Sequence, residues 1–135
     1  MRKRTQAREL ALQILYKIDV TADNPQKAEE EFWEFFKKDI DIQIKDFASR
    51  LVRGVIQNRE RIDNEISLYA KNWQLKRMAV VDRNILRLGC FELLFCEDIP
   101  PKVSINEAID LAKKYSGVEA GKFVNGILDK IKNRS

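Results

Sequence analysis

The segment from Asp82 to Phe95 constrains the fold most strongly, because its apolar residues leave almost no polar side. These apolar residues are Ile85, Leu86, Leu88, Cys90, Phe91, Leu93 and Leu94. A helix that is apolar on nearly every side is normally the buried centre of a domain, since only neighbouring elements can cover its whole circumference. We therefore expect the remaining segments to pack around this one.

The segments before the central one are predicted to be amphipathic helices, because their apolar residues recur at steps of three and four. One helix start is well marked, since Asn24 is a good N-cap and Pro25 suits the first helical position. The expected buried stripes are Leu10, Ala11, Ile14, Leu15 and Ile18; Ala28, Phe32, Phe35 and Phe36; Ile44, Phe47, Ala48, Leu51, Val52, Val55 and Ile56; and Ile62, Ile66, Tyr69 and Ala70.

After the central segment, Pro100 and Pro101 break the chain, and Ser104 with Glu107 matches a capping box at the start of a helix. Gly117 stands where a left-handed C-terminal cap is expected. The last helix is defined by Phe123, Val124, Ile127, Leu128 and Ile131. The sequence therefore predicts an all-α chain of about seven helices with no strand.

Composition argues against the common catalytic and metal sites. The chain has the length of one domain, 135 residues, with no histidine and only two cysteines, Cys90 and Cys96. Without histidine, Ser-His and Cys-His pairs cannot form, and the sequence has neither clustered zinc ligands nor a glycine-rich phosphate-binding loop. We therefore expect a protein that is not an enzyme, with no catalytic residue, no metal and no cofactor.

The sequence also indicates a cytoplasmic location. Both cysteines lie in apolar stretches, where a thiol usually behaves as a small core residue of a protein from a reducing compartment. The N-terminus lacks the apolar block of a signal peptide, and no apolar run approaches the roughly 20 residues that span a bilayer. No membrane partner is expected.

Basic residues are concentrated at the start of the chain. The net charge is only +4, but Arg2, Lys3, Arg4 and Arg8 all fall within the first eight residues. Arg4, Arg8, Leu12 and Tyr16 follow at steps of four, which predicts that they share one ridge of the first helix. Arginine contacts phosphates and tyrosine stacks on unpaired bases, so this ridge favours binding of single-stranded RNA. The alternative is a basic tail followed by an ordinary half-buried tyrosine.

Six motifs in a fixed order run from the first helix to the last. They are Ala7-Arg8-Glu9 with Gln13 and Leu15-Tyr16, then Val81 to Arg87, Ile99-Pro100 through Val103, Ile105 to Ala108, Leu111 to Tyr115, and Lys122 to Asp129. Taken together, they resemble the NusB family of transcription antitermination factors over nearly the whole chain. The resemblance implies one domain, residues 1–135, made of two perpendicular helical bundles at about residues 1–72 and 73–135.

The resemblance also implies a function. Members of the family bind the boxA element of nascent ribosomal RNA leader transcripts together with a small-subunit ribosomal protein, called NusE in this role. They help RNA polymerase to read through terminators as part of an antitermination complex, and they need no cofactor or metal.

By resemblance, the RNA-binding residues begin at the arginine-rich start and end on the last helix. They are Arg2, Lys3, Arg4, Arg8, Gln13 and Tyr16, then Lys122 and Phe123, with Glu119 at the edge of the surface. Thr5 and Gln6 interrupt the run of three arginines that members often carry.

The NusE-binding surface is expected on the polar residues of the central segment: Asp82, Arg83, Asn84 and Arg87. A structural alternative exists for Asp82, because a carboxylate at a helix N-terminus interacts favourably with the helix dipole without any partner. Asn106, Glu107 and Asn125 have equally good structural roles, in capping and in helix packing.

Two other functions stay open. The first is an RNA-targeting NusB-like domain of a ribosomal RNA cytosine methyltransferase, although no methyltransferase domain follows before Ser135. The second is a helical adaptor that binds only proteins, which would leave the basic ridge without a use.

Overall fold

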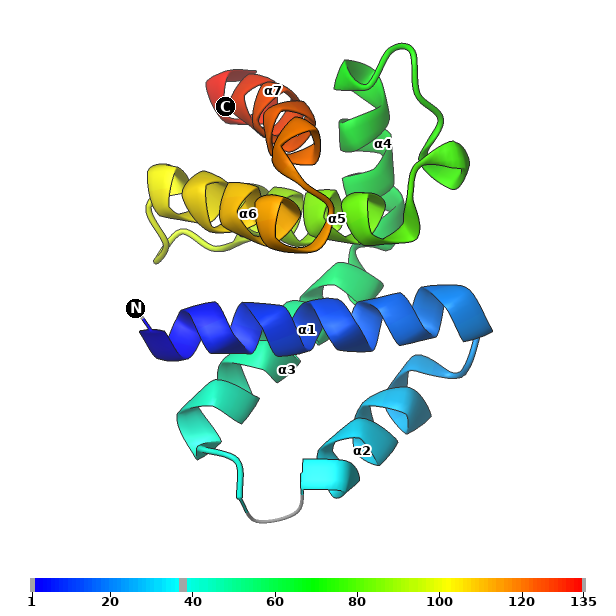
Figure 1. The fold of residues 1–135 in the computed structure, drawn as a ribbon, viewed down its shortest axis with the longest axis vertical. Helices are drawn as coiled ribbons and strands as arrows, with labels where there is room; N and C mark the ends of the chain where they lie inside the picture. Colours follow the sequence, from blue (N-terminus) through cyan, green and yellow to red (C-terminus); the bar gives the residue numbers. More distant parts are fainter. Residues whose placement is uncertain (1, 37–38, 135) are drawn as a thin grey trace.

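The computed structural model describes residues 2–36 and 39–134, which form seven α-helices, one short 3₁₀ helix and no strand (Figure 1). The elements are α1 (Arg2–Thr21), α2 (Pro25–Phe36), α3 (Ile42–Gln57), α4 (Arg59–Tyr69), η1 (Leu75–Arg77), α5 (Val80–Phe95), α6 (Pro101–Tyr115) and α7 (Val118–Arg134). The all-helical prediction is confirmed. None of the described helices combines the length and apolar character that crossing a membrane requires.

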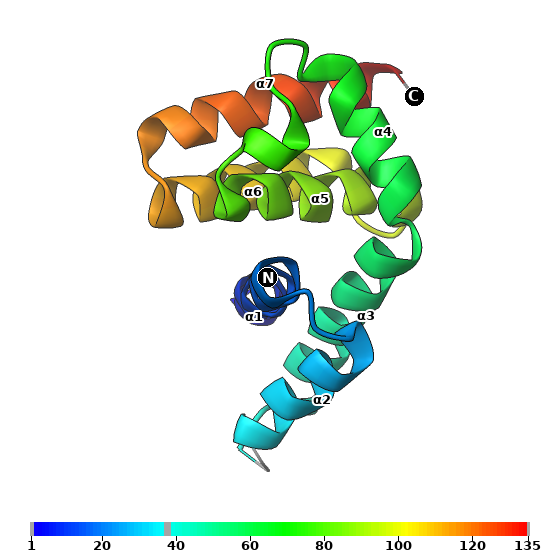
Figure 2. The same cartoon turned by 90° about the vertical axis from the view of Figure 1, so that its right-hand side faces the viewer.

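The helices form two groups, with α1 to α3 below and α4 to α7 above in the view of Figure 1, and Figure 2 shows the same division from the side. Helix α4 packs against α5 and α7 and buries Ile62 and Ile66 there. The Cys90 thiol of α5 also reaches the carbonyl oxygen of Ile62 at 4.0 Å. Helix α4 therefore packs with the upper group, although the resemblance implied that the first bundle extends to about residue 72.

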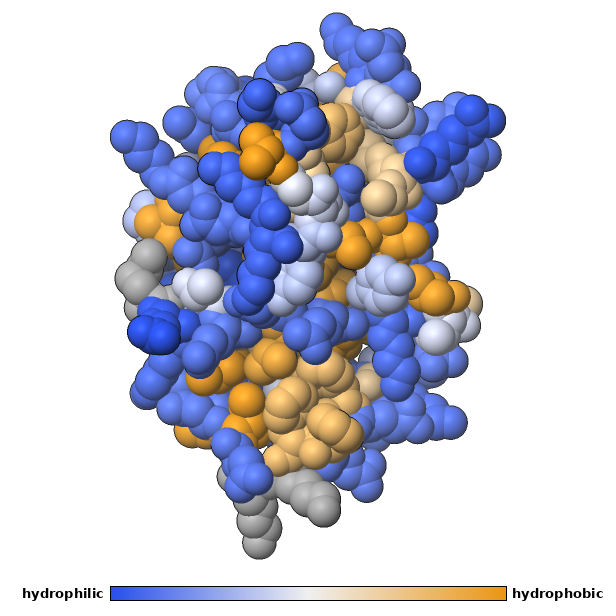
Figure 3. Space-filling view, viewed as in Figure 1, coloured by the Kyte–Doolittle hydropathy of each residue, from blue (hydrophilic) through white to orange (hydrophobic). Residues whose placement is uncertain are grey.

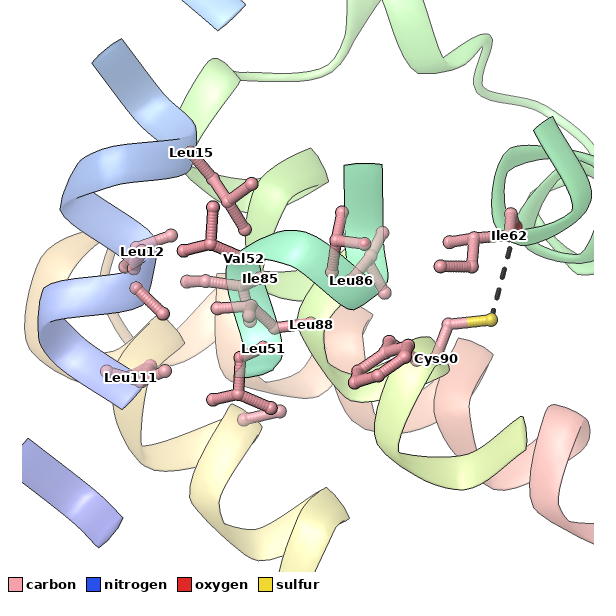
Figure 4. Packing of buried hydrophobic residues seen from close by; sticks show 14 of the residues in the cluster. Leu12, Leu15, Leu51, Val52, Ile62, Ile85, Leu86, Leu88, Cys90 and Leu111 are labelled. Carbon is pink, nitrogen blue, oxygen red and sulfur yellow. Dashed lines mark hydrogen bonds between the residues drawn. The ribbon is translucent and has the colours of Figure 1, made fainter. Parts of the chain in front are cut away.

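Helix α5 is the centre of the molecule, as its composition predicted. It contacts α1, α3, α4, α6 and α7. Figure 4 shows side chains from four of these helices meeting those of α5, and the labelled residues are Leu12 and Leu15 of α1, Leu51 and Val52 of α3, Ile62 of α4, Leu111 of α6, and Ile85, Leu86, Leu88 and Cys90 of α5. Helices α3 and α5 approach so closely that a Cβ atom at Gly54 would overlap the Phe91 ring. The two groups of helices therefore share one core.

The buried side of α2 differs from the prediction. Phe35 is 81% exposed, and Trp33 is buried in its place. The reason is a polar contact, because the buried carboxylate of Glu29 accepts hydrogen bonds from Trp33 Nε1 at 3.0 Å and from Ser49 Oγ at 2.6 Å. Glu29 and Trp33 therefore face α3, and this rotation leaves Phe35 outside.

The start of α6 also differs from the prediction. The helix begins at Pro101, where a missing N–H is tolerated, and Ser104 lies buried inside the helix and not at its cap. The capping-box prediction for Ser104 and Glu107 is therefore wrong. The prediction for the end of this helix is confirmed, because Gly117 has a φ of +104° and its N–H donates to the carbonyl of Ala112.

Candidate nucleic-acid interface

Helix α1 presents one face to the core and the other to solvent. One set of its exposed side chains follows helical spacing from end to end, and we call this set the outer stripe of α1: Arg2, Gln6, Gln13, Tyr16 and Val20. Figure 3 shows that the face seen in Figure 1 is hydrophilic along α1 and has a hydrophobic area below it, over α2. The outer stripe is therefore a surface that a polar ligand can reach.

The predicted ridge of Arg4, Arg8, Leu12 and Tyr16 is wrong. Arg8 is 2% exposed and Leu12 is buried, whereas Arg4 and Tyr16 lie at the surface. Each step of four residues turns about 40° beyond one full turn of an α-helix. The ridge therefore crosses the buried face of α1 between its two exposed ends.

Arg8 is the centre of a buried ion-pair network. Its Nε and Nη2 donate to the Glu92 carboxylate at 2.8 and 2.9 Å, and its Nη1 donates to Glu107 at 3.0 Å. Ser104 Oγ donates to Glu92 at 2.7 Å, and Thr5 Oγ1 donates to Glu107 at 2.7 Å. Burial lowers the pKa of the Arg8 guanidinium, but Glu92 and Glu107 outweigh it and leave that pKa raised. Arg8 therefore ties α1 to α5 and α6, and the structure removes it from the accessible surface.

The other basic residues at the start of α1 are exposed and line an open groove of about 750 Å³ against α3. The Arg4 guanidinium lies over the Phe47 ring, 4.4 Å from its centroid, and Arg50 approaches the same ring at 5.8 Å. A cation over an aromatic face is attracted by the ring quadrupole. Arg50 was missed by the sequence analysis, because no motif connects α3 with the start of α1 before the chain folds.

Carboxylates partly neutralise this groove. Lys3 Nζ lies 3.1 Å from Asp41, and Arg4 lies 3.8 Å from Asp98. Arg50 makes a closer pair with Asp98, at 2.6 and 3.0 Å, which holds the pKa of that carboxyl at about 2. An incoming phosphate group must therefore compete with these ion pairs, all of which are exposed and weak.

The end of α6, just before α7 begins, lies beside the outer stripe of α1. Glu9, which lies on the same side of α1 as Gln13, accepts hydrogen bonds from Lys114 Nζ at 2.9 Å and from Tyr115 Oη at 2.7 Å. Those two donors end α6, and α7 follows after the turn at Gly117. The structure therefore brings the two predicted RNA-binding segments, α1 and the start of α7, to one face.

The predicted residues at the start of α7 differ in exposure. Glu119 and Lys122 are exposed and lie 3.5 Å apart. Phe123 is half-buried, and its ring meets Trp73 edge-on with a centroid distance of 6.0 Å. Lys122 and the rim of Phe123 are therefore available to a ligand, with the Glu119 carboxylate next to them.

Most of the predicted NusE-binding residues are tied to Asp19 at the end of α1. Arg83 donates to the Asp19 carboxylate at 2.7 and 2.6 Å, Asn84 donates at 2.9 Å, and Arg87 donates at 3.1 Å. Burial raises the pKa of Asp19, but these three donors outweigh it and lower that pKa to about 2. Arg87 also donates to Asp63 at 2.9 Å. Asn84 and Arg87 are buried, so the structure does not offer them to a partner.

Asp82 is different, because it lies at the edge of the molecule in the first turn of α5. The N-cap of this helix is Ala79, and no side chain caps it. The Asp82 Oδ1 atom is buried and accepts no hydrogen bond from the described residues. Asp82 makes no capping hydrogen bond, although its place in the first turn fits the dipole alternative. Asp82 and partly exposed Arg83 are what remains of the predicted partner surface.

The two cysteines are core residues, as predicted. Cys90 and Cys96 are both buried. Burial raises the pKa of the Cys90 thiol to about 12 and also raises the pKa of Cys96, so neither is a reactive thiolate at neutral pH.

Arg8 was expected to bind RNA, but its buried ion pairs predict a role in stability. Arg8→Ala should destabilise the fold by about 3–5 kcal/mol, because it leaves the buried Glu92 carboxylate without its cation. Arg4→Ala, which changes an exposed guanidinium on the same helix, should lose less than about 1 kcal/mol. Urea unfolding of both variants checks this difference, and equal midpoints would show that the buried pair does not hold α1 in place.

Comparison with known proteins gives the family. The NusB family model matches residues 5–133. A relative from Anaeromyxobacter dehalogenans, named transcription antitermination protein NusB, is 52% identical over 129 residues, which cover 96% of this chain and 89% of the relative. A protein of the same name from Syntrophus aciditrophicus is 46% identical over 96% of this chain and 79% of its own length.

Solved structures agree with this match. A crystal structure of antitermination factors NusB and NusE in complex with dsRNA contains a chain with a TM-score of 0.87 and 36% identity, covering 100% of this chain and 99% of that one. NusB of T. maritima has a TM-score of 0.87 and 42% identity, with coverage of 96% and 90%. The family match and these identities show that the chain belongs to the NusB family.

Proposed function

We propose that the chain is a transcription antitermination factor that binds the boxA element of ribosomal RNA leader transcripts together with NusE and promotes read-through by RNA polymerase. It would act in the cytoplasm, where these transcripts are made. The similarity to the chain in the NusB–NusE–dsRNA structure supports RNA and NusE as ligands. The relatives are named as antitermination proteins, and the match covers 89% of the length of the one from Anaeromyxobacter dehalogenans. This favours an antitermination factor over an RNA-targeting domain of a methyltransferase.

The observation that carries the RNA-binding part is the single face built by α1 and α7. Hydrogen bonds from Lys114 and Tyr115 to Glu9 hold the end of α6 against α1, and α7 starts directly after the turn that follows. Basic side chains stand at both ends of this face, and exposed Gln13 and Tyr16 lie between them.

Each exposed residue then has a role that its chemistry supports. Phosphate contacts are assigned to Arg2, Lys3, Arg4, Arg50 and Lys122. Tyr16 and the rim of Phe123 offer aromatic surface for unstacked bases, and the Gln13 amide can both donate and accept hydrogen bonds at a base edge. Glu119 borders the surface and offsets the charge of Lys122.

Salt dependence tests the electrostatic part. Neutralising about two to four phosphates predicts a log–log slope of roughly −1.5 to −3 for the binding of boxA RNA to the isolated chain. The double variant Arg4→Ala, Lys122→Ala should weaken binding and make the slope shallower by roughly 1.4, at about 0.7 per phosphate. Lys27→Ala, which removes an exposed lysine of α2, is the matched control and should change neither quantity. A wild-type slope near zero would contradict the assignment.

We assign the NusE contact to the start of α5, where Asp82 and Arg83 are partly exposed. Asp82 supports this assignment, because its carboxylate is partly exposed and makes no ion pair with any of the residues that the structure describes, so a cationic partner would displace no internal contact. The start of α5 is separate from the groove that Lys3 and Arg4 line against α3, so RNA and NusE do not compete for the same side chains.

Charge reversal tests the partner site. Asp82→Lys should weaken NusE binding at least tenfold, roughly 1.4 kcal/mol, while boxA RNA binding by the free chain stays equal or improves slightly. Asp110→Lys reverses an exposed carboxylate of α6 and serves as the control. Calorimetry at low salt measures both, and a circular dichroism melt of each variant reports folding. Equal NusE affinity of wild type and Asp82→Lys would place the partner surface elsewhere.

A further inference from the structure

The segment that joins α4 to α5, residues 70–79, carries only positive charge. Lys71, Lys76 and Arg77 are exposed, and Trp73 stands between them with 57% of its surface exposed. Hydrophilic side chains project from the upper right of the molecule in Figure 3, where Figure 1 draws this segment. We call residues 70–79 the basic loop. The basic loop therefore places an aromatic side chain among three cations.

The backbone of the basic loop is fixed. Arg83 Nη1 donates to the carbonyl oxygens of Leu75 and Lys76, each at 3.3 Å. The N–H of Arg77 donates to the Gln74 carbonyl at 2.9 Å, and Met78 is buried in the core. The loop therefore presents its charges from a defined position, and little conformational entropy is lost when they bind.

The cations of the basic loop make fewer ion pairs than those at the start of α1. Lys3 pairs with Asp41 and Arg4 with Asp98, whereas none of Lys71, Lys76 and Arg77 pairs with a carboxylate in residues 2–36 and 39–134. A phosphate group that binds here displaces no internal ion pair. The loop is therefore the less neutralised of the two basic regions.

Trp73 connects the basic loop to the α7 edge of the proposed RNA surface. Its ring meets Phe123 at an interplanar angle of 73°, so the contact uses an edge and does not stack the two faces. A hollow of about 520 Å³ lies beside Trp73, and polar side chains of Ser67, Asn72 and Gln74 line part of it. A base stacked on Trp73 would have amide and hydroxyl groups within its reach, which suits an unpaired nucleotide.

From this arrangement we propose that the basic loop is a second contact for single-stranded RNA, which binds nucleotides flanking the boxA element. Trp73 stacks on one flanking base, and Lys71, Lys76 and Arg77 contact the phosphates on either side of it. This inference rests on the proposed function, because the RNA reaches the loop by continuing past Lys122 and Phe123.

The test compares three RNAs: the boxA element alone, and the same element extended by an unstructured pyrimidine run at its 5′ end or at its 3′ end. Wild type should bind one of the extended RNAs more tightly than boxA alone. Trp73→Ala should lose about tenfold in affinity for that RNA, as expected for one stacked base. The triple variant Lys71→Ala, Lys76→Ala, Arg77→Ala leaves Phe123 untouched and should lose the whole benefit of the extension. The triple variant should bind boxA alone like wild type.

Two exposed residues of α2 provide matched controls. Phe35→Ala removes an exposed aromatic ring, and Lys27→Ala removes an exposed cation, both from the other group of helices. Neither should distinguish the extended RNA from boxA alone.

Tryptophan fluorescence reports the stacking directly. The chain has two tryptophans, and Trp33 is buried and bonded to Glu29, so quenching by an RNA base can arise only at Trp73. The extended RNA should quench wild type and not Trp73→Phe, which keeps an aromatic ring and most of the affinity.

The outcomes separate this inference from the function on which it rests. If wild type binds boxA but loop variants bind the extended RNAs as wild type does, the inference is overturned and the proposed function stands. Loss of NusE affinity in the loop variants with unchanged RNA affinity would likewise overturn it and assign the loop to the protein partner. Failure of wild type to bind boxA RNA would overturn both.

Discussion

Two buried networks of carboxylates and guanidinium groups fix α1 against α5, and the exposed surface of the protein depends on them. Near its start, α1 contributes Arg8 to Glu92 of α5, and near its end it contributes Asp19 to Arg83 and Arg87 of the same helix. Replacing such pairs with apolar residues is often neutral for stability. Here the two networks fix the orientation of α1 about its own axis, because Arg8 and Asp19 can reach their partners in only one orientation. In that orientation the outer stripe faces solvent.

The same constraint sorts the basic residues by task. Arg8 is inside, where Glu92 and Glu107 neutralise it, and Arg2, Lys3 and Arg4 are outside, where any ion pairs they make are exposed. The polar residues of α5 are divided in the same way. The buried ones hold α1, whereas Asp82 lies in the first turn and stays partly exposed. A helix that looks like a simple apolar core element is therefore also the part that orients α1, the helix that we propose binds RNA.

The helices, the central position of α5 and the family could be predicted from the sequence, because apolar periodicity and ordered motifs are local signals. The buried ion pairs could not. Arg8 finds its partners 84 and 99 residues away, and Glu92 resembles a solvated residue until Ser104 and Arg8 are placed around it. The capping box failed for the same reason, since Glu107 serves Arg8 and not its own helix. Only the fold shows that Arg87 faces Asp19 and Asp63.

The account claims that α1 binds RNA with its outer side while Arg8 stays locked in the core. The arginine Nε–H resonances of ¹⁵N-labelled protein test this most directly during a titration with boxA RNA. The Nε–H of Arg8 donates to Glu92 at 2.8 Å and should be slow to exchange with water and unmoved by RNA, whereas those of Arg2 and Arg4 should shift and saturate together. A shift at Arg8 as large as theirs, saturating at the same RNA concentration, would contradict the account.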